Sequence, residues 1–98
     1  MTPNQKLTNV IKGRIIEDLQ INPTDVSLRF ADGSVMHVKV MESNSPPLKK
    51  GARIRAVYEQ SAALAISCED QSQLAVILAD PGASVSVRGE KGNVEYLG

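Results

Sequence analysis

The chain has 98 residues, of which 42% are hydrophobic, and its eleven basic residues balance eleven acidic ones. This length suits one domain over residues 1–98 with a single core, and the interspersed charges are typical of a soluble globular chain. A balanced charge without a block of one sign predicts neither nucleic acid nor an acidic membrane surface as a partner. Two tyrosines and one phenylalanine are too few aromatic side chains for a base-stacking surface.

The cysteine count and the hydropathy of the chain indicate its compartment. The single cysteine, Cys68, excludes an intrachain disulfide and fits a reducing environment. No apolar run approaches the roughly 20 residues that a membrane-spanning helix needs. The N-terminal segment lacks the apolar stretch of a signal peptide. We therefore expect a cytoplasmic protein that does not enter a membrane.

The first predicted element is a short helix over residues 3–11. Thr2 would cap it, and Pro3 would occupy its first position, where the missing N–H costs nothing. Its apolar face would be narrow, because the apolar residues recur at spacings of three and four. They are Leu7, Val10 and Ile11.

Residues 26–40 predict a β-hairpin. Apolar side chains occupy every second position of both arms, which is the pattern of a half-buried strand. A three-residue loop over 31–33 keeps both apolar sets on one face and pairs Leu28 with Met36. That loop needs a left-handed residue at its last position, which Gly33 adopts without steric cost.

Residues 64–78 repeat this pattern less regularly. The loop over 69–71 places Gln71 where the first hairpin has Gly33, and it pairs Ile66 with Leu74. The similarity extends upstream, so that the chain could contain two half-repeats, 12–40 and 50–78. Two interpretations remain open: a duplication, or the resemblance that any two amphipathic hairpins share.

The remaining segments complete a mainly β prediction. Turn and linker residues separate further short strands, and the clearest linker is 42–51, which contains Pro46-Pro47. The further strands are expected over 14–21, 53–60, 84–88 and 94–97. Seven or eight short strands with a short N-terminal helix predict a small antiparallel sandwich or barrel.

The chain carries no recognisable catalytic, metal or cofactor motif. His37 is the only histidine, so no second imidazole can complete a metal site, and alternation places it on the face opposite Met36 and Val38, toward solvent or another layer. Cys68 lies on the apolar phase of its strand, which predicts a buried and unreactive thiol. Asp32 and Asp70 occupy matching turn positions, where aspartate hydrogen bonds to its own backbone. No cofactor or metal is therefore expected.

Two functional hypotheses follow. The first is a non-enzymatic protein-interaction or structural domain that could form a homodimer, because exposed strand edges and neutral charge favour association. The second is a small-molecule-binding domain or minor enzyme, with a pocket between the half-repeats lined by Arg14, Arg53, Arg88 or Tyr96. Under either hypothesis, Arg88 and Tyr96 are the candidate binding residues, because they could meet across the C-terminal hairpin.

Overall fold

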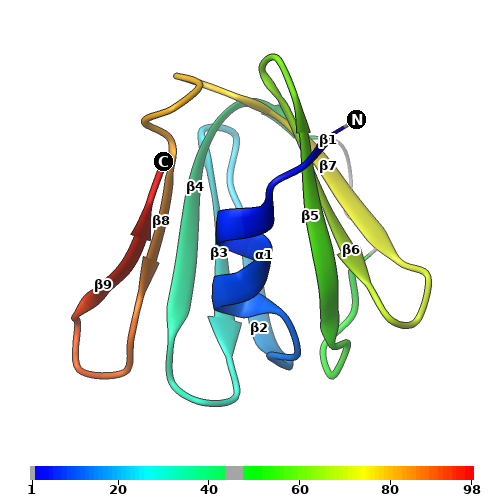
Figure 1. Ribbon diagram of the computed structural model, residues 1–98, viewed down its shortest axis with the longest axis vertical. Coiled ribbons are helices and arrows are strands. Elements are labelled where there is room, and N and C mark those ends of the chain that lie inside the picture. The colour runs from blue at the N-terminus through cyan, green and yellow to red at the C-terminus, as the bar shows by residue number, and fades with distance from the viewer. Residues whose placement is uncertain (1, 44–47) are drawn as a thin grey trace.

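A computed structural model describes residues 2–43 and 48–98, and these form nine strands and one short helix (Figure 1). The elements are β1 (Thr2–Pro3), α1 (Gln5–Ile11), β2 (Ile16–Ile21), β3 (Asp25–Phe30), β4 (Val35–Ser43), β5 (Ile54–Gln60), β6 (Ala63–Cys68), β7 (Gln73–Leu78), β8 (Val85–Arg88) and β9 (Val94–Leu97). The fold is mainly β and antiparallel, as predicted from the spacing of the short strands. Within the described ranges no helix is long and apolar enough to cross a membrane.

The strands form one curled sheet with the order β1-β5-β6-β7-β4-β3-β2. Strand β4 is long enough to take part in two sets of pairings. Its residues 35–38 pair with β8, and its residues 40–43 pair with β7 after a register shift. Strand β9 then pairs with β8. Because β4 changes partners along its length, the sheet bends into the half-barrel visible in Figure 1.

Strand β2, at one end of the strand path, meets β5, the neighbour of β1 at the other end, where β2 and β5 begin. An isolated antiparallel bridge pairs Ile15 with Arg53. The Ile16 N–H donates to the Ala52 carbonyl at 2.8 Å, and the Ile54 N–H donates to the Arg14 carbonyl at 2.9 Å. The curled sheet is therefore held closed at this point.

Several backbone hydrogen bonds have a counterpart in which both residues are shifted by 38 positions along the chain. The same number of positions separates Ile15 from Arg53. The two bonds just described are one such pair. In three further pairs, each written as N–H donor to carbonyl acceptor, the second bond repeats the first 38 residues away. They are Gly13 to Ile54 with Gly51 to Ile16, then Ala31 to Ile15 with Glu69 to Arg53, and finally Val40 to Thr24 with Leu78 to Ala62. Strands β2 to β4 and strands β5 to β7 thus occupy equivalent positions in the closed sheet.

The registers predicted for both hairpins are confirmed. Leu28 pairs with Met36, and Ile66 pairs with Leu74. The left-handed position of each loop also lies where it was expected, with a φ of 89° at Gly33 and 75° at Gln71. The alternation of apolar residues and the three-residue loops were sufficient to determine both registers.

The predicted start of the helix was wrong. α1 begins at Gln5, and its cap is Asn4, whose Oδ1 accepts a hydrogen bond from the Leu7 N–H at 3.0 Å. Thr2 and Pro3 instead form β1, which pairs with β5. Proline is tolerated there because an edge strand leaves one side of its backbone unpaired. The predicted linker at Pro46-Pro47 lies outside the described residues.

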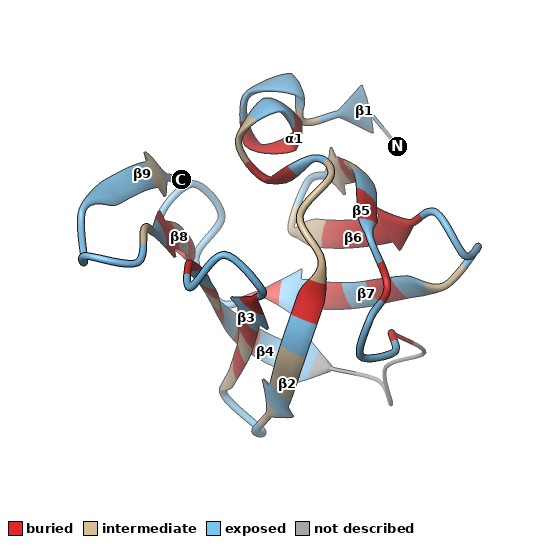
Figure 2. Ribbon diagram, turned by 90° about the horizontal axis from the view of Figure 1, so that it is seen from below, coloured by how far each residue is buried: buried red, intermediate tan, exposed pale blue. Residues whose placement is uncertain are grey.

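Helix α1 completes the core from one side of the curled sheet. Leu7 and Ile11 are fully buried, as the predicted apolar face requires, and α1 packs against β5 and β9 (Figure 2). The core also contains the inward side chains of the strands. The largest of these are Phe30, Ile16, Leu28, Met36, Ile54, Leu64, Ile66 and Leu74.

Candidate functional site

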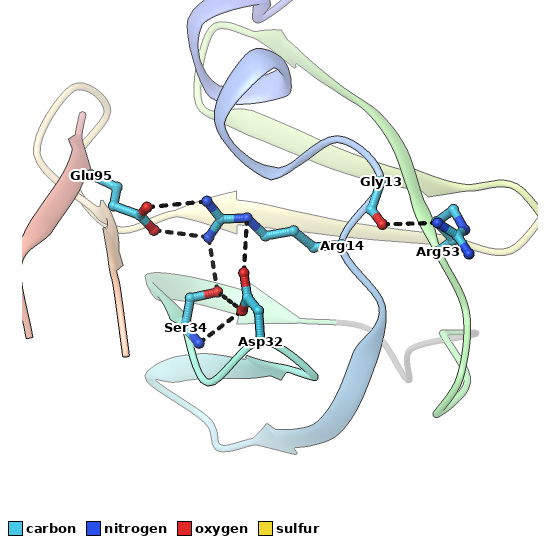
Figure 3. A network of polar contacts seen from close by, with 6 residues as sticks. All are labelled: Gly13, Arg14, Asp32, Ser34, Arg53 and Glu95. Carbon is cyan, nitrogen blue, oxygen red and sulfur yellow. Dashed lines mark hydrogen bonds and ion pairs between the residues drawn. The ribbon is translucent and has the colours of Figure 1, made fainter. Parts of the chain in front are cut away.

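The most connected polar group in the described chain is the guanidinium of Arg14 (Figure 3). Arg14 precedes β2, and its side chain is only 17% exposed. Its Nη1 lies 2.8 Å from both Glu95 Oε1 and Ser34 Oγ, and its Nη2 lies 3.2 Å from Glu95 Oε2. Its Nε lies 3.6 Å from Asp32 Oδ2. Arg14 therefore joins β2, the turn between β3 and β4, and β9.

The polar groups of this network bond to one another. Two carboxylates, from Asp32 and Glu95, flank the one guanidinium. The Ser34 hydroxyl and the Ser34 backbone N–H hydrogen bond to Asp32 and hold the pKa of that carboxyl below its usual value. Because the donors and acceptors satisfy one another, the network fixes the C-terminal hairpin to the rest of the sheet.

The structure places Arg88 and Tyr96 on opposite faces of the β8–β9 hairpin. Tyr96 pairs with buried Val87 and is itself half-buried, and its hydroxyl accepts a hydrogen bond from Asn4 Nδ2 at 3.1 Å. Arg88 is exposed and donates to the Gly92 carbonyl at 3.4 Å. Since neighbouring strand positions point to opposite sides, the two candidate residues do not form a common surface.

The four side chains that could line a pocket are not gathered around one cavity in the described ranges. Arg14 lines a shallow depression beside Asp32, whereas Arg53 lines a separate one beside Glu69. Arg53 donates to the Gly13 carbonyl at 3.3 Å and lies 3.8 Å from Glu69. These arginines are engaged by neighbouring groups of the fold.

A different surface, the outer face of β6 and β7, has an unusual composition. Two cross-strand pairs, Ala63 with Ile77 and Ala65 with Ala75, point away from the core. We call these four residues the alanine face. They line a groove of about 330 Å³, whose rim includes Glu42 and Gln73. Ala65, which is 1% exposed, forms part of the groove floor.

The equivalent positions on β3 and β4 carry the opposite chemistry. There the cross-strand pairs are Asp25 with Lys39 and Ser27 with His37, and we call these four residues the polar face. The imidazole Nε2 of His37 lies 2.8 Å from Asp25 Oδ2, and this contact lowers the pKa of the Asp25 carboxyl. His37 thus points outward, as its strand phase predicts.

The two faces show that the fold tolerates polar as well as apolar side chains at these outward positions. The same backbone arrangement accepts charged and hydroxyl side chains on β3 and β4 but carries three alanines and an isoleucine on β6 and β7. The closed sheet therefore does not itself require small apolar residues at these positions. The outer face of β6 and β7 thus differs in chemistry from the equivalent outer face of β3 and β4.

Sequence reasoning missed the alanine face because it followed only the inward phase of each strand. The signal was present in the alternate positions, where Ala63, Ala65, Ala75 and Ile77 stand in place of polar residues. Reading both phases of the predicted hairpin at 64–78 would have found them.

Two further groups bear on chemistry. Cys68 is buried, and this burial raises the pKa of its thiol. Across residues 2–43 and 48–98, no three side chains of the histidine, cysteine, aspartate and glutamate types are grouped as metal ligands.

Comparison with protein-family models, with curated proteins and with solved structures finds no match to this chain. The alanine face is therefore chosen as the candidate functional site from the chemistry of its side chains alone.

Proposed function

We propose that this protein is a non-enzymatic protein-interaction domain that binds through the alanine face. The observation that carries the proposal is the difference between equivalent positions. Asp25, Ser27, His37 and Lys39 correspond to Ala63, Ala65, Ala75 and Ile77 in the closed sheet. Covering an uncharged face of small side chains removes apolar area from water without burying unpaired charge.

The proposal accounts for the shape of the surface as well as its composition. Small side chains let a partner approach the sheet closely, and the 330 Å³ groove gives such a partner a recess to fill. Ile77, which is 37% exposed, and Met41, which is 71% exposed, add apolar surface on β7 and on the neighbouring β4.

A photo-crosslinking residue at position 75 tests the proposal in native lysate. We expect position 75 to form a crosslink to protein, because Ala75 lies in the groove. The same residue at position 37, the equivalent position of the polar face, is the matched control and should crosslink much less. Equal crosslinking at both positions, or none at position 75, would contradict the proposal.

The triple variant A63D/A75H/I77K gives the alanine face three residues that the polar face already carries. We expect its melting temperature to stay close to that of the wild type, because the fold accepts this set at equivalent positions. Binding of the protein partner at the alanine face should fall sharply, because the new charges would have to lose their water on binding. Circular dichroism measures the first quantity and sedimentation the second. Undiminished association of a folded variant would exclude the alanine face as the contact.

Three finer assignments belong to the same proposal. We propose that half-repeats 12–40 and 50–78 arose by duplication, which the hydrogen bonds recurring 38 residues apart support. We propose a cytoplasmic location, which the single buried thiol supports. We propose protein rather than nucleic acid as the partner, because the overall charge is balanced and the alanine face carries no charge.

A further inference from the structure

We infer that the molecule covering the alanine face is a second copy of this chain, related to the first by a two-fold axis. This inference rests on the proposed function and specifies its partner. In a two-fold contact the same surface is used by both copies, so the surface must be complementary to itself in shape and in charge.

The alanine face and its margin contain both a recess and projecting groups. The recess is the groove floored by Ala65 and Ala75, and Ile77 projects beside it. Tyr58 pairs with Ala65 on the other side and supplies an aromatic surface at the opposite margin. Two copies can therefore place the Ile77 of each chain toward the Tyr58 margin of the other while the exposed Ala75 residues of the two copies meet.

The charges at the margins are also self-complementary. Glu42 lies on β4 opposite Ile77, at one corner of the surface. Arg55 lies on β5 at the diagonally opposite corner, where its Nη2 donates to Ser67 Oγ at 2.8 Å. A two-fold axis that passes between Ala65 and Ala75, at right angles to this diagonal, brings Glu42 of each copy to Arg55 of the partner subunit. The dimer gains two such ion pairs at its rim.

The direction of this axis also fixes how the sheets cross. The diagonal from Glu42 to Arg55 spans four strands and about the same distance along β6, given spacings of about 4.8 Å between strands and 3.3 Å between residues. An axis perpendicular to it rotates the strands of one copy to roughly right angles with those of the other. Orthogonal packing is one of the two common arrangements of stacked sheets.

Electrostatics favour this partner over a strongly charged one. The chain carries eleven positive and eleven negative residues, so two copies meet without net repulsion. The four residues between the two charged corners are uncharged, so the centre of the contact needs no counter-charge.

Charge exchange at the corners tests the inference by sedimentation equilibrium. We expect the wild type to be dimeric. E42R and R55E should each weaken the dimer by at least about tenfold, because each single change creates two like-charge contacts. The double variant E42R/R55E should recover an affinity within a few-fold of the wild type. K39E makes the same charge change as R55E on the polar face and should leave the dimer intact.

The outcomes separate this inference from the proposed function. If the wild type is monomeric and position 75 crosslinks to another protein, the partner is not a second copy. The alanine face would then still be the binding surface. A dimer that both single variants and A63D/A75H/I77K leave unchanged uses another surface, and this result overturns the inference of a second copy at the alanine face, while the crosslink at position 75 still tests the proposed function. Weakening by each single variant without recovery in the double variant would reject the pairing of Glu42 with Arg55 and hence this two-fold arrangement. Thermal unfolding confirms that each variant is folded.

Discussion

Asp32 and Asp70 show how one side chain determines a turn at the scale of single residues. Each carboxylate accepts a hydrogen bond from the backbone N–H two residues later, at 2.9 Å in both turns, and another from the same serine's hydroxyl. The hydroxyl and then the N–H hold the pKa of each carboxyl below its ordinary value. These aspartates therefore act in folding rather than in a paired-acid site.

Acidification should destabilise the protein through these carboxylates. Because their pKa values are lower in the folded than in the unfolded chain, ionised Asp32 and Asp70 contribute stability above the unfolded pKa of about 3.9. That contribution is lost as the pH falls through the lower, folded pKa. We expect the melting temperature of the wild type to decrease when the pH is lowered below about 4. The melting temperature of D32N/D70N should depend less on pH. Calorimetry between pH 2 and 7 measures both, and a wild-type profile as flat as that of the variant would contradict this account.

At the scale of elements, the two hairpin loops are equivalent in geometry but not in sequence. Gly33 and Gln71 both have positive φ, and a side chain pays a steric penalty there that glycine does not. A Cβ at Gly33 would also lie 2.8 Å from Glu90 Cγ. The first loop is thus suited to its conformation, whereas the second holds a less favourable residue.

Exchange of these two residues should change stability in opposite directions. Q71G should raise the free energy of unfolding by about 0.5–1 kcal/mol, because it relieves the left-handed strain. G33A should lower it by about 1–2 kcal/mol, because it adds this strain and a contact with Glu90. Urea unfolding measures both, with Q73G in the adjoining strand as a control that should not stabilise. Destabilisation by Q71G would show that the contacts of the Gln71 side chain stabilise the fold by more than the left-handed backbone at this position destabilises it.

The elements that could be predicted were those that local residues determine. Alternation and loop length determined both hairpins, and Val85 and Val87 identified β8. The start of α1 was not predictable from Thr2 and Pro3, because their extended conformation depends on pairing with β5, far away in sequence. The alanine face is a different case. The alignment of the half-repeats already places Ala63 and Ala75 opposite Asp25 and His37, and the structure adds that all four side chains lie on the outer face of the sheet.

At the scale of the whole molecule, α1 is a structural part of the single core. Leu7 and Ile11 are fully buried, and the Thr8 N–H and hydroxyl tie the helix to its cap and to β5. A seven-residue helix is not stable alone, so its stability comes from this packing. The helix and the sheet should therefore unfold together.

Truncation of the helix core should destabilise the entire fold. L7A should lower the free energy of unfolding by about 2–5 kcal/mol, because it leaves a cavity under α1. K6A, on the exposed side of the same helix, should change it by less than about 0.5 kcal/mol. Far-ultraviolet circular dichroism and tyrosine fluorescence should give coincident unfolding curves. Separate transitions for helix and sheet would show that α1 is an independent unit.

The pairing of Ile15 with Arg53 governs the order in which the fold can form. The two hairpins close loops of three residues and can form within microseconds. The ladder at Ile15 and Arg53 must instead bring together segments separated by one complete half of the sheet, and this loop-closure entropy is lost before any new contact compensates for it. We therefore expect the joining of the two hairpins to be the slow event in folding, which would make the contact between Ile15 and Arg53 a late one.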